Sequence, residues 1–195
     1  MSLPVTLFPI SLQEICKRVP IPVIGVIDPG ARAAVSATKN KKIGIIGTEA
    51  TIKSSAYSKA INEMEHNIEV YGFACPLFVP LVEEGWTDGA VARMVAERYL
   101  TEVRDKGVDT LVLGCTHYPL LKDVIQEVMG TVRLVDSAVE TAVAVEQLLV
   151  KKGMQAQNET AETKRFFVTD SPEKFISVGE RFLETKIDAI EKIQI

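Results

Sequence analysis

The chain has 195 residues, of which 47% are hydrophobic and 25% charged, so it can bury a substantial core. Lysine and arginine total 22 against 26 acidic residues, without any cluster of like charge, which argues against nucleic acid or an anionic membrane surface as a partner. No apolar run approaches the roughly 18 residues of a membrane span, and the first ten residues lack a signal peptide's basic start, so we expect a cytoplasmic protein whose partner is a small molecule or another protein.

Short apolar runs that end in small or turn-forming residues recur along the chain. They are P-V-I-G-V-I at 22–27, K-I-G-I-I at 42–46 and T-L-V-L at 110–113, and helical patterns follow most of them. Such alternation is typical of a buried parallel sheet with helices on its faces. We therefore predict an α/β fold that binds its ligand beyond the carboxyl ends of the strands.

Helical patterns cover residues 54–63, 88–103 and 137–152, the last ending at Gly153. A polar stretch at 154–164 predicts an exposed loop, before a last strand in R-F-F-V-T-D and a last helix in P-E-K-F-I-S-V-G-E-R-F-L. The apolar segment C-P-L-F-V-P-L-V-E-E-G at 75–85 predicts an irregular cover over the sheet ends, because its two prolines disfavour a central strand or a helix interior.

The first candidate site is G-T-E-A-T at 47–51, directly after a predicted strand. It offers backbone amides, the hydroxyls of Thr48 and Thr51, and a helix N-terminus that favours an anion such as a carboxylate. The alternative is that Thr48 only caps the next helix, which is a common role for threonine.

The second candidate is G-C-T-H-Y-P at 114–119, where Cys115 stands at a strand end. A thiolate is a usable base or nucleophile only when its pKa is low enough, and His117 could supply positive charge or relay a proton. Thr116 adds a hydroxyl and an amide. The alternative is that Cys115 packs as a small hydrophobic residue and His117 bonds a loop carbonyl.

Further along the apolar segment, Glu83 is a candidate site carboxylate, although charged side chains are usually solvated. The three cysteines, Cys16, Cys75 and Cys115, are far apart and form no C-x-x-C pair, which argues against a disulfide framework and a zinc site. We expect no bound metal, and we assign Cys75 to packing.

Five motifs together resemble the glutamate racemase family. The resemblance covers about residues 11–183, and G-C-T-H-Y-P-L-L is highly specific to this family and its aspartate racemase relatives. The five motifs are I-P-V-I-G-V-I-D-P-G-A, I-G-I-I-G-T-E-A-T, A-C-P-L-F-V-P-L-V-E-E-G, L-V-L-G-C-T-H-Y-P-L-L and V-D-S-A-V-E-T-A.

The resemblance implies racemisation of glutamate without a cofactor, supplying D-glutamate for peptidoglycan. One cysteine thiolate removes the Cα proton while a second thiol on the opposite face delivers one. Cys115 matches the second of these thiols, with His117 assisting it. By the same match Thr48, Thr51 and Thr116 bind the substrate, and Glu83 belongs to the polar residues near the site.

The N-terminal part departs from the family. The segment A-C-N-T-A-S, which carries the first catalytic cysteine, has no counterpart, and that cysteine would align with Pro4 in the foreign run P-V-T-L-F-P. Because codons for this run can encode Cys-Asn-Thr-Val-Ser in another frame, we hypothesise a frameshift. A chain with one active-site thiol should racemise poorly.

The family pattern predicts three-layer, parallel-sheet domains of the Asp/Glu racemase type, one complete and one partial. Residues 1–28 would be a remnant of the N-terminal domain, 29–132 the complete domain, and 133–195 a segment that packs back onto the first. Apolar faces left without partners predict self-association into a homo-oligomer. Other possibilities are a non-catalytic binding module, an aspartate racemase, or a thiol-dependent acyl-transfer enzyme using Cys115 and His117.

Overall fold

The computed structural model describes residues 9–155 and 164–194. The described residues form two compact units, the first ending at Gly153 and the second beginning at Met154. Most of the run P-V-T-L-F-P, including Pro4, and most of the predicted polar loop lie outside the described residues.

The first unit is built on a four-stranded, fully parallel sheet with the order β2-β1-β3-β4. Its strands are β1 (Lys42–Gly47), β2 (Glu69–Ala74), β3 (Thr110–Leu113) and β4 (Arg133–Asp136). The central strands β1 and β3 are almost continuously apolar and buried, as expected of a parallel sheet covered on both faces. The predicted α/β class is confirmed.

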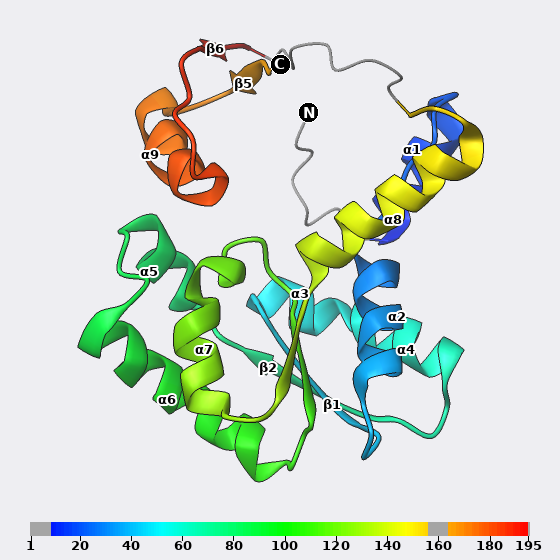
Figure 1. The fold of residues 1–195 in the computed structure, drawn as a ribbon, viewed down its shortest axis with the longest axis vertical. Coiled ribbons are helices and arrows are strands. Elements are labelled where there is room, and N and C mark those ends of the chain that lie inside the picture. Colours follow the sequence, from blue (N-terminus) through cyan, green and yellow to red (C-terminus); the bar gives the residue numbers. More distant parts are fainter. Residues whose placement is uncertain (1–8, 156–163, 195) are drawn as a thin grey trace. The chain divides into compact units, whose positions relative to one another are not determined.

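Helices cover both faces of this sheet (Figure 1). One core contains side chains of α2 and α4, and the other contains side chains of α5, α6 and α7. The helices of the unit are α1 (Pro9–Arg18), α2 (Ile27–Ala37), α3 (Glu49–Ser54), α4 (Ala56–Met64), α5 (Phe78–Glu83), α6 (Gly89–Asp105), α7 (Lys122–Met129) and α8 (Ser137–Lys152), with a 3₁₀ turn η1 (Tyr118–Leu121) before α7. None of the helices in the described residues is long and apolar enough to cross a membrane.

The second unit contains two short parallel strands and one helix. Strand β5 (Phe166–Val168) pairs with β6 (Ile190–Lys192), and α9 (Pro172–Leu183) lies between them in sequence. The rings of Phe166 and Phe175 pack with their centroids 5.9 Å apart. The strand and helix predicted in this part of the chain are confirmed.

Two local predictions are wrong. Residues 22–26 form no strand, and Ile27 already begins α2; Pro20 and Pro22 lack the amide hydrogens that a strand would donate. The proline-rich segment at 75–85 is not irregular, since Phe78–Glu83 is a helix. Pro80 fits there because it lies in the first turn, where amide hydrogens have no acceptor within the helix.

The sheet also extends beyond residue 132, where the predicted complete domain ends. Strand β4 begins at Arg133 and pairs with β3 in continuous register, from Thr110 opposite Arg133 to Leu113 opposite Asp136. The helix after it, α8, begins at Ser137 and packs against α2 and β4. The compact units divide after Gly153, and the predicted boundaries of the racemase domains stay a prediction.

Candidate functional site

The candidate site lies where the chain reverses its direction across the sheet. From β1 the chain moves outward to β2, then returns to place β3 on the other side of β1. The carboxyl ends of β1 and β3 therefore flank a topological switch point, which is where open parallel sheets bind ligands. Thr48 follows β1, and Gly114 and Cys115 follow β3.

Thr48 is both a helix cap and a residue of the site. Its hydroxyl accepts a hydrogen bond from the Thr51 amide at 3.3 Å, and the two hydroxyl oxygens lie 3.1 Å apart. A Cβ atom at Gly47 would stand 3.0 Å from Thr51, so the glycine lets this turn close tightly. Capping and ligand binding, treated as alternatives above, are therefore compatible here.

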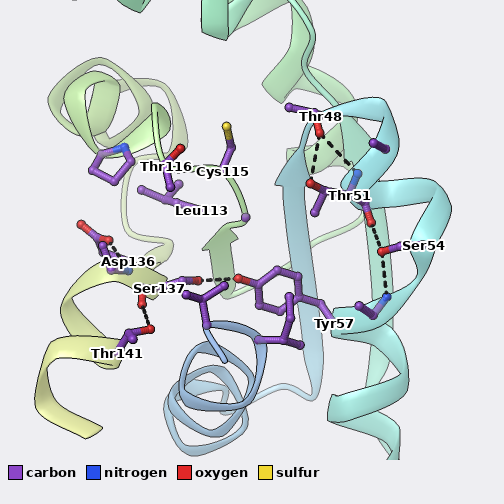
Figure 2. A pocket seen from close by; sticks show the side chains of 17 residues that line it. Thr48, Thr51, Ser54, Tyr57, Leu113, Cys115, Thr116, Asp136, Ser137 and Thr141 are labelled. Carbon is purple, nitrogen blue, oxygen red and sulfur yellow. Dashed lines mark hydrogen bonds between the residues drawn. The ribbon is translucent and has the colours of Figure 1, made fainter. Parts of the chain in front are cut away.

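A cavity of about 290 Å³ opens at this edge of the sheet, close to the lower end of the range for small-molecule sites. Four predicted residues line it, namely Thr48, Thr51, Cys115 and Thr116, and Figure 2 shows them around the hollow. The remaining lining side chains are mostly small or apolar, apart from Ser54, Tyr57, Asp136, Ser137 and Thr141.

The Cys115 thiol is partly buried at the end of β3. Burial raises the pKa of Cys115, while the amide of His117, the hydroxyl of Thr116 and the amide of Tyr118 act in the opposite direction. Burial prevails, so the resting thiol is protonated at neutral pH. The same amides and hydroxyl would hold a thiolate once it formed.

His117 and Glu83 do not line the cavity. His117 Nδ1 lies 3.9 Å from the Cys115 sulfur and 3.4 Å from the Thr116 hydroxyl, while its Nε2 lies 3.8 Å from Glu83 Oε1. The imidazole therefore stands between a thiol and a carboxylate. This arrangement suits transfer of a proton or stabilisation of a charge.

The other two cysteines are not brought to the cavity. Cys16 is exposed on α1, and Cys75 is fully buried after β2, where burial raises its pKa to about 12. The assignment of Cys75 to packing is confirmed. Within the described residues, no three histidine, cysteine or carboxylate side chains converge as metal ligands would.

Sequence reasoning missed the contribution of β4 and α8 to the cavity. Asp136 caps α8 by accepting a hydrogen bond from the Ala138 amide at 2.9 Å, and Ser137 and Thr141 follow on the same helix. The signal was present, because L-V-D-S at 134–137 repeats the pattern of an apolar run that ends in polar residues before a helix. Its shortness, with only two apolar residues, hid the strand.

A family model described as Asp/Glu/Hydantoin racemase matches residues 9–148. The chain belongs to this family. The glutamate racemase of Geobacter metallireducens is 50% identical over 188 residues, which cover 95% of this chain and 69% of that protein. The resemblance to the glutamate racemases, and with it the class of amino-acid racemase, is confirmed.

Solved structures agree with this family assignment. The glutamate racemase isoform RacE1 from Bacillus anthracis superposes with a TM-score of 0.88 at 39% identity, covering 95% of this chain and 69% of that one. The glutamate racemase of Francisella tularensis, solved in complex with D-glutamate, gives a TM-score of 0.84 at 39% identity, with 93% and 66% covered. About one third of each relative's length therefore has no counterpart in the superposition.

Proposed function

We propose that the cavity binds glutamate and that Cys115 exchanges the proton at its Cα atom. The observation that carries the proposal is the position of Cys115 among three threonine hydroxyls, in a cavity at the switch point of the sheet. D-glutamate in the Francisella tularensis structure supports this choice of substrate.

Each side chain then has a distinct role. His117, paired with Glu83, accepts the proton of the resting Cys115 thiol. The resulting thiolate takes the proton from Cα, and the electron pair of the broken C–H bond stays on the substrate as a carbanion. Hydrogen bonds to the adjacent carboxylate stabilise this charge, which suits Thr48, Thr51 and Thr116. His117, backed by Glu83, balances the charge on Cys115 as the proton leaves and returns. A largely apolar cavity wall limits the access of water.

Inversion of the stereocentre requires a proton donor on the opposite face of Cα. Among the described residues Cys115 is the one thiol that lines the cavity, since Cys16 and Cys75 do not. We therefore expect this chain by itself to bind glutamate and to exchange its Cα proton, but to racemise it slowly.

The test combines binding with turnover. Titration calorimetry should detect D- or L-glutamate binding to the chain, with weaker binding of aspartate, and circular dichroism should detect little racemisation. A chain extended upstream with the family's first cysteine segment should racemise, and its Cys115→Ser variant should not. The absence of glutamate binding at millimolar ligand would contradict the proposed substrate.

A second candidate function is ligand binding without turnover. The presence of a single thiol at the cavity favours it. It predicts glutamate binding that Cys115→Ser leaves unchanged, with no proton exchange by either protein. Cα exchange that depends on Cys115 would exclude it.

The proposed cellular role is the supply of D-glutamate for peptidoglycan in the cytoplasm. The three free cysteines are consistent with a reducing compartment. Detection of the protein in the cytoplasmic fraction, and D-glutamate auxotrophy on deletion of the gene, are the expected results.

We also propose self-association through α8. Val139, Val143 and Val150 are each about half exposed and recur at helical spacing along one side of the helix. Light scattering at micromolar concentration should show a dimer or larger species, and Val143→Lys should shift it toward the monomer. A monomer in the parent chain would contradict this proposal.

A further inference from the structure

Tyr57 lines the cavity but has no role in the reaction proposed above. It lies on α4, is only 4% exposed, and its hydroxyl shares a 2.8 Å hydrogen bond with the hydroxyl of Ser137. Ser137, 7% exposed, is the first residue of α8. Figure 2 shows the ring reaching across toward Ser137. The pair therefore joins two helices that are 80 residues apart in sequence.

Two glycines make room for this pair. A Cβ atom added at Gly30 on α2 would stand 2.6 Å from the Ser137 hydroxyl and 3.2 Å from Tyr57 Cε1. A Cβ atom added at Gly114 would stand 3.2 Å from Cε2, on the other edge of the ring. The ring is thus held edge-on between the backbone of α2 and the backbone directly before Cys115.

The hydroxyl of Tyr57 is uncharged in this arrangement. Burial raises its pKa, opposed by the hydrogen bond to Ser137 and reinforced by the nearby acids Cys115 and Asp136. It therefore remains protonated across the physiological range, so it acts through its fixed hydrogen bond rather than by exchanging protons.

We propose that Tyr57 is a positioning residue for the Cys115 thiol. Its ring supports the backbone at Gly114 and closes one side of the cavity next to the thiol. Its hydroxyl locks the ring to the start of α8. The inference rests on the proposed role of Cys115, because positioning matters only if that thiol works.

The test measures the reactivity of the Cys115 thiol and does not require catalytic turnover. The rate of alkylation of Cys115 by iodoacetamide is measured against pH, with the modified peptide quantified by mass spectrometry. Tyr57→Leu should admit water beside the thiol and lower the midpoint of the profile by about half a unit or more, which is about a threefold faster reaction below the midpoint. Tyr57→Phe keeps the ring and should restore most of the parent profile.

Ile61→Ala is the matched control, because Ile61 is fully buried one turn further along α4. It should lower the melting temperature and leave the alkylation profile unchanged. An unchanged profile in Tyr57→Leu, or an equal shift in Ile61→Ala, overturns the inference. If circular dichroism shows that Tyr57→Leu is unfolded, Tyr57→Met replaces it, because it also removes the ring but fills more of its space; a shift in the same direction is expected, and a parental profile would contradict the inference. A chain that does not racemise glutamate can still give the expected alkylation profiles. Failure of the proposed function and failure of the proposed role of Tyr57 are therefore distinguishable.

Discussion

Cys75 and Cys115 follow two strands of the same parallel sheet, β2 and β3, yet the surroundings of the two thiols differ. Cys75 directly follows the edge strand β2, is fully buried among apolar side chains, and has a pKa raised to about 12. Cys115 follows the central strand β3, borders a cavity, and has two amides and a hydroxyl that favour its thiolate. The position of a strand at the switch point, rather than the presence of a cysteine at a strand end, makes a thiol available for chemistry.

The segment after Cys75 also serves the other cysteine. The Tyr118 hydroxyl donates a 2.8 Å hydrogen bond to the Cys75 carbonyl, and the Tyr118 ring meets Phe78 edge-on at 5.2 Å. Helix α5, which ends at Glu83, is thereby held against the turn that follows Cys115. The backbone carbonyl of Cys75 therefore helps to hold the turn that follows Cys115.

The largest expected effect is the difference in reactivity between the two thiols. At pH 8, iodoacetamide should modify Cys115 at least roughly a hundredfold faster than Cys75, because only thiolates react and burial suppresses the Cys75 thiolate. The rate at Cys115 should rise with pH toward and beyond 9, since its pKa is raised. Peptide mapping by mass spectrometry measures both sites in one sample. Equal alkylation rates of Cys75 and Cys115 in the folded chain would contradict the proposed difference between the two thiols.

A smaller effect is expected from the threonine hydroxyls that line the cavity with Cys115. Thr48→Ala should weaken glutamate binding about tenfold, because a hydrogen bond to a carboxylate is lost, and should cost about 1 kcal/mol of unfolding free energy through the lost cap. Titration calorimetry and denaturant unfolding measure the two quantities.

The matched control for Thr48→Ala is Thr101→Ala on α6, where the hydroxyl donates to the Glu97 carbonyl at an exposed position. This variant should leave glutamate binding unchanged. Unchanged binding in Thr48→Ala as well would restrict Thr48 to its capping role.

The smallest effect is expected from the carboxylate that links the two regions. Glu83→Gln should slow Cα proton exchange by about fivefold or less, since a partly exposed ion pair contributes at most about 1 kcal/mol. The adjacent and more exposed Glu84 provides the control, and Glu84→Gln should have no effect. Exchange rates measured by NMR separate the outcomes, and an equal slowing in both variants would show that Glu83 has no specific role.

The two central strands, β1 and β3, could be predicted because they are apolar runs that end in polar residues, and a parallel sheet brings such ends to one edge; the edge strands β2 and β4 were missed. Thr48, Thr51, Cys115 and Thr116 were found in this way. The helix at Phe78–Glu83 was missed because proline is tolerated in a first turn, a position that composition alone does not reveal.

The part of the cavity formed by Tyr57 and Ser137 could not be predicted, for a different reason. The pairing of Tyr57 with Ser137 depends on three elements meeting across 80 residues of sequence. Ser137 lies in the pattern L-V-D-S, but no local pattern marks Tyr57 or its pairing with Ser137. Contacts of this kind are set by how α2 and α8 pack, which periodicity does not specify.

Exchange of the glutamate Cα proton in D₂O, followed by proton NMR, tests most directly whether Cys115 is the working thiol. The parent chain and Cys75→Ala should both remove the Cα proton signal from at least one enantiomer, without inversion, and Cys115→Ser should leave the signal intact. Exchange by Cys115→Ser at the parental rate, or no exchange by the parent at saturating glutamate, would contradict the assignment of proton transfer to Cys115.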